Sequence, residues 1–190
     1  MSAIKCIIAA GGLGTRLQGF RGNESTKILL KVNSKPMIVQ QLEQLISWGL
    51  EEFIIITNQA GIATNDLTNQ KLDNIHKNMT SRLKDLDIHI IDIFISKDHW
   101  QSNNFRRKPN PGMFYEASSK YLFRLDKTFY IGDDIRDCQA AYNSKCQGLM
   151  ISDKISYENC YSSIIFKDLE KMVPHILEKY NLYLNQLKLK

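Results

Sequence analysis

Aspartate is missing from the early part of this 190-residue chain, where none occurs before Asp66. The chain also lacks a long apolar run. Its longest uninterrupted apolar stretches, such as Cys6 to Ala10, have the length of a core strand and fall far short of the ~18 residues of a membrane span. Nothing at the N-terminus has the pattern of a signal peptide. We therefore expect a soluble cytoplasmic protein with no membrane partner.

Clustered cysteines are absent as well. The four cysteines are far apart, with no pair at C-x-x-C spacing, which predicts free thiols and no zinc centre. The formal charge of +5 comes from scattered lysines, a distribution that suits phosphorylated small molecules and not a nucleic-acid partner. There is no repeat and no linker, and 43% apolar content over this length predicts one domain, residues 1–190.

Short β-branched runs alternate with longer amphipathic segments, which predicts a Rossmann-like α/β sandwich of three layers with a mainly parallel sheet. Strands are expected at residues 4–10, 52–57, 88–96, 128–132, 148–152 and 163–166. Helices are expected at residues 36–49, 65–86, 111–124 and 134–144, with a last helix around residues 169–177 in which Pro174 marks either the start or a kink.

In open α/β sheets, ligands bind beyond the carboxyl ends of the strands. The polar residues at those positions are Gly11 to Arg16, Thr57 to Gln59, Arg107 to Pro109, and Gly132 to Asp134.

Thr57 and Asn58 can donate to the oxygens of a phosphoryl group, and Lys108 can offset its negative charge. Asp133 and Asp134 are hard oxygen ligands that suit Mg²⁺. Each residue also has an ordinary structural role open to it: a turn cap, a strand-to-helix turn, or a surface charge.

Three segments in register carry a resemblance to a known family. They are Thr57-Asn58-Gln59-Ala60-Gly61-Ile62-Ala63, Arg107-Lys108-Pro109-Asn110-Pro111-Gly112-Met113, and Tyr130-Ile131-Gly132-Asp133-Asp134-Ile135-Arg136-Asp137. Over about residues 52–177 the chain resembles the heptose-bisphosphate and histidinol-phosphate phosphatase branch of the haloacid dehalogenase superfamily.

The resemblance implies a fold of that superfamily without a large cap domain, and Mg²⁺-dependent phosphatase activity on a sugar bisphosphate such as heptose 1,7-bisphosphate. It implies catalytic roles for Lys108, Thr57 and Asn58, and substrate binding by Arg107. Asp133 would be the main metal ligand, with Asp134 beside it. The cysteines of the family's zinc loop have no match here, and His99 alone stands in that loop, so no zinc is expected.

The departure from the family lies on the first strand. These phosphatases attack phosphorus with an aspartate and use a second aspartate, two residues on, as general acid and base. Alignment on Gly14-Thr15 places Gly11 and Leu13 at those two positions. We therefore expect impaired turnover and weakened Mg²⁺ affinity.

The first 57 residues are similar to the opening of sugar-1-phosphate nucleotidyltransferases, through Gly11-Gly12-Leu13-Gly14-Thr15-Arg16-Leu17, Lys27, and Lys35-Pro36-Met37-Ile38. That resemblance implies binding of a nucleoside triphosphate. Gly11, Gly12 and Gly14 would let the backbone approach it, and Arg16 and Lys27 would neutralise its charge.

Three alternatives to an active phosphatase remain open at this point. The chain could be a nucleotidyltransferase-like nucleotide binder, or a sugar-phosphate-binding protein without catalysis. The glycine-rich loop could also be an ordinary strand-to-helix connection. Fusion of two reading frames near residues 54–57 is a further hypothesis.

Overall fold

The computed structural model describes residues 6–9, 31–32, 34–47, 52–153 and 155–188. Its centre is a six-stranded sheet in the order β5-β4-β1-β6-β7-β8, in which every neighbouring pair is parallel. The strands are β1 (Cys6–Ala9), β4 (Phe53–Asn58), β5 (Ile90–Ser96), β6 (Phe129–Gly132), β7 (Gln147–Ile151) and β8 (Ile164–Phe166). A separate antiparallel pair joins β2 (Lys31–Val32) to β3 (Lys35–Pro36).

Helices cover both faces of this sheet, so its inner strands read as nearly continuous apolar runs. β4 shows this most clearly, since its first five residues are all buried. The helices are α1 (Met37–Ser47), α2 (Asn69–Lys84), α3 (Gly112–Tyr121), α4 (Ile135–Ser144) and α5 (Leu169–Lys188), with short 3₁₀ turns η3 (Leu125–Lys127) and η4 (Tyr157–Asn159).

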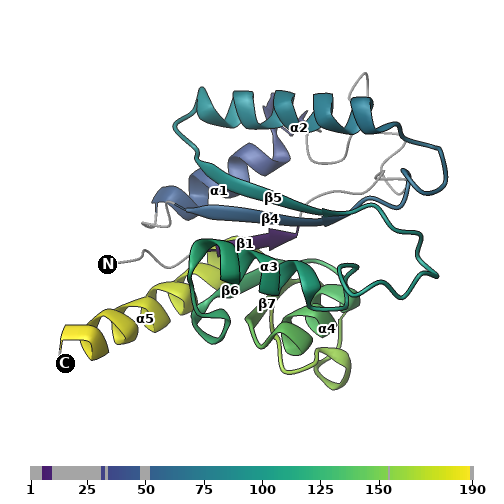
Figure 1. Ribbon diagram of the computed structural model, residues 1–190. Helices are drawn as coiled ribbons and strands as arrows, with labels where there is room; N and C mark the ends of the chain where they lie inside the picture. The colour runs from purple at the N-terminus through teal and green to yellow at the C-terminus, as the bar shows by residue number, and fades with distance from the viewer. Residues whose placement is uncertain (1–5, 10–30, 33, 48–51, 154, 189–190) are drawn as a thin grey trace.

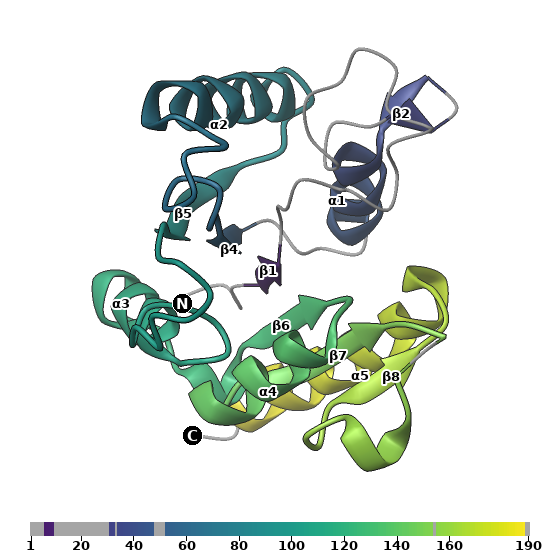
Figure 2. The same cartoon turned by 90° about the vertical axis from the view of Figure 1, so that its right-hand side faces the viewer.

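The two faces carry separate apolar cores. Side chains of α1, α2 and α5 pack on one face around Phe53, Ile55 and Phe129. Side chains of α3 and α4 pack on the other face around Ile54 and Tyr130. Figure 1 shows α1 and α2 above the strands with α3 and α4 below, and Figure 2 shows the same layers after a quarter turn. The predicted three-layer α/β fold is confirmed.

One helix start differs from its sequence-based expectation, and a second resolves an open alternative. α2 begins at Asn69, not at residue 65, because the Thr68 side chain accepts a hydrogen bond from the Lys71 N–H and so caps the helix there. α5 begins at Leu169, as the sequence predicts, and Asp168 Oδ1 accepts from the Lys171 N–H at 2.9 Å in its first turn. Pro174 therefore lies inside the helix.

This topology places the carboxyl ends of the inner strands β4, β1 and β6 side by side. We call this end of the strands the carboxyl edge of the sheet. The long connection from β5 to α3, residues 97–111, starts at the same edge. Among the helices of the described ranges, none is both long enough and apolar enough to cross a membrane.

Candidate functional site

The candidate site lies at this carboxyl edge of the sheet. β4 supplies Thr57 and Asn58, the connection after β5 supplies Arg107 and Lys108, and the turn after β6 supplies Asp133 and Asp134. The remaining predicted residues are Gly11, Gly12, Gly14, Arg16 and Lys27, and they lie outside the described residues.

Lys108 forms a closed triangle with Tyr130 and Asp137. Its Nζ donates to Tyr130 Oη at 2.8 Å and to Asp137 Oδ1 at 2.9 Å, and Tyr130 Oη donates to the same Oδ1 at 2.7 Å. All three side chains are buried, with Lys108 only 9% exposed. An ammonium group has three N–H donors, so two are engaged within the protein and one is left for a bound group.

The electrostatics of the triangle favour a charged carboxylate beside a neutral phenol. Burial acts to raise the pKa of Asp137, but the charge of Lys108 and hydrogen bonds from Lys108 and Tyr130 outweigh burial and hold that pKa below its usual value. Burial, aided by the charge of Asp137, raises the pKa of Tyr130 well above its ordinary value. Tyr130 therefore stays protonated and able to donate.

Asn58 fixes the backbone of Lys108. Its Nδ2 donates to the Lys108 carbonyl at 3.0 Å, and its Oδ1 accepts from the Lys108 N–H at 3.1 Å. The Lys108–Pro109 peptide bond is cis. The amide of Asn58 thus positions Lys108, and its predicted contact with a phosphoryl group stays a prediction.

Thr57 and Arg107 keep donors at the same edge of the sheet. Thr57 is buried, and its Oγ1 accepts from Gln59 Nε2 at 3.1 Å, which leaves the hydroxyl proton available. Arg107 donates from Nη1 to the Asp98 carbonyl at 2.9 Å. Burial and the nearby charge of Arg136 lower its pKa. The two guanidinium groups and Lys108 bring positive charge to this end of the sheet, beside the carboxylates of Asp134 and Asp137 that pair with two of them.

The turn after β6 holds Asp137 through Gly132. A Cβ at Gly132 would lie 2.4 Å from Asp137 Cβ and 2.8 Å from its Oδ2, so only glycine lets the carboxylate lie against the strand end. Asp137 Oδ2 accepts in turn from the Asp133 N–H at 3.3 Å. The same carboxylate thus orients both Lys108 and the Asp133 turn.

The two predicted metal ligands have different surroundings. Asp133 is exposed at the end of the strand. Asp134 caps α4, and its Oδ1 and Oδ2 accept from the Arg136 guanidinium at 2.8 and 3.1 Å. Within the described ranges, no three histidine, cysteine, aspartate or glutamate residues form a group that could hold a metal. The donors fit a cation that takes one carboxylate and completes its shell from water and a phosphate.

His99 lies in the connection between β5 and α3, stacked on Trp100 with ring centroids 3.8 Å apart. Its Nδ1 accepts from the Gln101 N–H at 3.3 Å, so this nitrogen shapes a local turn.

Tyr130 is the residue of the site that sequence reasoning missed. It stands in the middle of β6, where an aromatic residue is ordinary core material. The only available signal was its alternation with Phe129 and Ile131, which places its side chain on the face opposite theirs, toward α4 and Asp137.

Comparison with known families and sequences gives consistent matches. The family model described as polynucleotide kinase 3 phosphatase matches residues 22–176. The D-glycero-beta-D-manno-heptose-1,7-bisphosphate 7-phosphatase of Escherichia coli O6:H1 is 29% identical over 111 residues, which cover 55% of this chain and 58% of that protein. The Helicobacter pylori J99 protein of the same name is 26% identical over 66% of this chain and 72% of its own length.

A third relative is the histidine biosynthesis bifunctional protein HisB of Campylobacter jejuni serotype O:6, 26% identical over 80% of this chain. The matched region spans 43% of that protein, so the chain covers about half the length of some of these relatives.

Two solved structures share the fold. A D,D-heptose 1,7-bisphosphate phosphatase from B. bronchiseptica, complexed with magnesium and phosphate, superposes with a TM-score of 0.71 at 19% identity and covers 93% of this chain and 99% of its own. A putative haloacid dehalogenase-like phosphatase from Mesorhizobium loti gives a TM-score of 0.66 at 15% identity, over 94% and 87% of the two chains.

Proposed function

The chain belongs to the polynucleotide kinase 3 phosphatase family, and we propose that it binds a phosphorylated sugar and hydrolyses it slowly with Mg²⁺. The observation that carries this proposal is the buried Lys108, held by Tyr130 and Asp137 with one N–H left over. A preorganised cation in a buried setting interacts with a phosphoryl group far more strongly than one in water.

Each residue of the edge has a task in this proposal. Lys108 donates its remaining N–H to a phosphoryl oxygen, and the Thr57 hydroxyl donates to a second one. Asn58 and Asp137 are positioning residues, since they fix the main chain and the ammonium of Lys108. Arg107 adds positive charge for the rest of the substrate.

Asp133 is the residue that would hold Mg²⁺, because it is exposed and directly follows the last residue of β6. Asp134 would join only by releasing Arg136. A bound Mg²⁺ supplies charge neutralisation between carboxylate and phosphate, and it lowers the pKa of a bound water.

A sugar bisphosphate such as D-glycero-D-manno-heptose 1,7-bisphosphate is the proposed substrate, supported by the names of the Escherichia coli and Helicobacter pylori relatives. Slow turnover is proposed because no aspartate precedes Asp66. The two aspartates that serve as nucleophile and as general acid in the phosphatases that this chain resembles therefore have no counterpart on the first strand. Hydrolysis then depends on direct attack by water.

The test is phosphate release from heptose 1,7-bisphosphate at high enzyme concentration, with and without Mg²⁺. We expect slow release that Asp133→Asn abolishes, and Asp133 is exposed, so this variant should fold normally. Asp153→Asn, an exposed aspartate elsewhere, is the matched control and should leave the rate unchanged. Release that persists in Asp133→Asn would rule out the metal-dependent reaction.

Binding of the same bisphosphate, followed by calorimetry, separates recognition from turnover. Binding without release from any metal-loaded sample would favour the sugar-phosphate-binding alternative. The nucleotidyltransferase alternative stays a prediction on residues 1–57. It requires nucleoside triphosphate binding that weakens in Arg16→Ala.

A further inference from the structure

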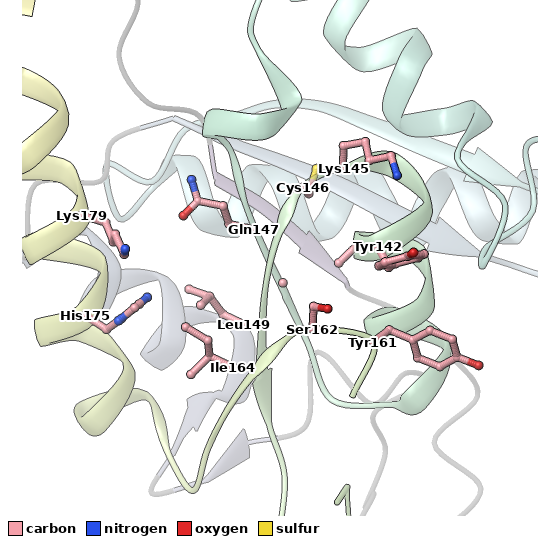
Figure 3. A pocket seen from close by; sticks show the side chains of 12 residues that line it. Tyr142, Lys145, Cys146, Gln147, Leu149, Tyr161, Ser162, Ile164, His175 and Lys179 are labelled. Atoms are coloured by element: carbon pink, nitrogen blue, oxygen red, sulfur yellow. The ribbon is translucent and has the colours of Figure 1, made fainter. Parts of the chain in front are cut away.

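A pocket separate from the Lys108 site lies near the amino ends of β7 and β8. It has a volume of about 370 Å³ and is lined by the C-terminal end of α4, the start of β7, the start of β8 and one side of α5 (Figure 3). Gln147 and Ile164 are the first residues of β7 and β8, whereas Asp133 follows the last residue of β6. The proposed phosphatase reaction therefore makes no use of this pocket.

Basic groups dominate its polar lining. Lys145, His175 and Lys179 contribute to the wall, and none of the described residues that line the pocket is acidic. In the described part of the chain, Lys179 has no salt bridge or hydrogen bond. A concave surface with cations and no carboxylate in its lining favours an anionic ligand.

The charge is strongest on the α5 side. Lys145 is the C-cap of α4 and lies over the Tyr142 ring, 5.1 Å from its centroid, so a ring and a helix C-terminus already offset part of its charge. His175 and Lys179 are one turn apart on α5 and project toward Leu149 and Ile164. The binding position for an anionic group is therefore between these two side chains and the start of β7.

His175 can donate an N–H to a group bound there. Burial, and then the charge of Lys179, lowers its pKa, while Glu178 acts in the opposite direction. A neutral imidazole offers one N–H to an anion beside the full charge of Lys179.

Three large side chains of the remaining lining are exposed. Tyr142, Tyr161 and Ile164 are 51%, 43% and 40% exposed, and all three line it. Tyr161 and Ser162 are consecutive residues with positive φ, 49° and 63°, a conformation that costs free energy in residues other than glycine. Exposed apolar groups around a basic binding position are suited to the apolar part of an organic anion.

We propose that this pocket binds a small organic anion, with a phosphate or carboxylate head group held by Lys179 and His175 and an apolar body about one ring in size. The body lies on Leu149 and Ile164 and reaches toward the tyrosines. Both head groups share the same recognition chemistry, so the test includes one of each.

The probes are phenylphosphonate, which has no P–O–C bond for a phosphatase to cleave, benzoate, and methylphosphonate as a head group without a ring. Binding is followed by NMR through the imidazole signals of His175 at millimolar probe concentrations. We expect saturable shifts with phenylphosphonate or benzoate, and weaker binding of methylphosphonate. The head group that binds more tightly identifies the ligand class.

Variants separate this pocket from the phosphatase site. Lys179→Ala should weaken binding about tenfold, the loss of one charge-assisted contact. Lys171→Ala, an exposed lysine on the same helix outside the pocket, is the matched control and should not change the affinity. Ile164→Ala should weaken phenylphosphonate more than methylphosphonate.

Three results would overturn the proposal. They are the absence of a saturable shift with any probe, an affinity unchanged in Lys179→Ala, and a shift that disappears in Asp133→Asn, which would place the bound anion at the carboxyl edge of the sheet. Because the readout is binding at His175, failure here leaves the phosphatase proposal untouched, and the reverse also holds.

Discussion

Tyr130 is the residue whose role goes furthest beyond what its sequence position suggests, because it joins Lys108 and Asp137 with one hydroxyl. Tyr130→Phe removes that hydroxyl and leaves one N–H of Lys108 and one site of Asp137 Oδ1 unsatisfied. Since both groups are buried, we expect unfolding free energy to fall by about 1–2 kcal/mol. Denaturant unfolding measures this loss.

Tyr121→Phe is the matched control for that substitution. Tyr121 also donates to a carboxylate, Asp92 Oδ2 at 2.9 Å, but at a partly buried position with Lys120 as a second partner. Its loss should cost less than about 1 kcal/mol. Equal costs at the two tyrosines would mean that the triangle adds nothing beyond an ordinary hydrogen bond.

The residues of the site differ in how far the sequence could predict them. Lys108 and Asp133 were predictable because they directly follow recognisable loops or strand ends. The task of Asn58 was not, since its partner is a main chain 50 positions away. Asp134 was predicted as a metal ligand from its place in the turn after a strand and from the family resemblance, and nothing in the pattern indicated that Arg136, two residues on, would pair with it.

At the scale of elements, the turn from β6 to α4 matters most, because it holds the Asp137 carboxylate under the strand end. Gly132→Ala would place a methyl group 2.4 Å from Asp137 Cβ. We expect a loss of about 1–3 kcal/mol in unfolding free energy, together with weaker sugar-phosphate binding as Lys108 loses its partner. Unfolding and calorimetry on the same samples test both effects.

Gly61→Ala provides a comparison in the turn after β4. There the nearest atom to an added Cβ is Leu67 Cβ at 3.3 Å, so a small adjustment suffices and the cost should stay below about 1 kcal/mol. A Gly132→Ala protein with normal stability and binding would show that the carboxylate does not need its close approach to the strand.

Strands were easier to predict than helix starts, for a physical reason. A run such as Phe53 to Ile56 is apolar because both of its faces are covered, so its composition marks its limits. A helix start depends on which side chain caps it, and Asn65 and Thr68 are both good candidates. Asn65 instead adopts a positive φ of 61° in the turn, and Thr68 makes the cap.

At the scale of the whole molecule, the site connects three separate strand-helix units. Asn58 follows β4, Lys108 follows β5, and Asp137 belongs to α4 after β6, so their contacts join segments 29 and 50 positions apart. The resemblance to phosphatases is confirmed by the family match, which begins at residue 22. The resemblance of residues 1–57 to nucleotidyltransferases stays a prediction.

Because the Lys108–Asp137 pair connects these units, it should govern the acid stability of the whole fold. The folded-state pKa of Asp137 is depressed, so its contribution is fully present above the unfolded value of about 3.9 and is lost as pH falls through the folded value. Asp137→Asn should therefore cost about 3 kcal/mol at neutral pH, since Lys108 loses its buried partner.

Unfolding free energies of the wild-type protein and Asp137→Asn, measured from neutral pH down to acid, test this expectation. The difference between them should be constant above about pH 5 and should shrink steadily below about pH 4, as protonation removes the charge of Asp137 in the wild-type protein. Asp126→Asn, at an exposed pair with Arg124, should show only a small difference throughout. If the difference in unfolding free energy between the wild-type protein and Asp137→Asn does not shrink in acid, the cost of the substitution comes from lost packing or a lost hydrogen bond. It would then not come from the ion pair.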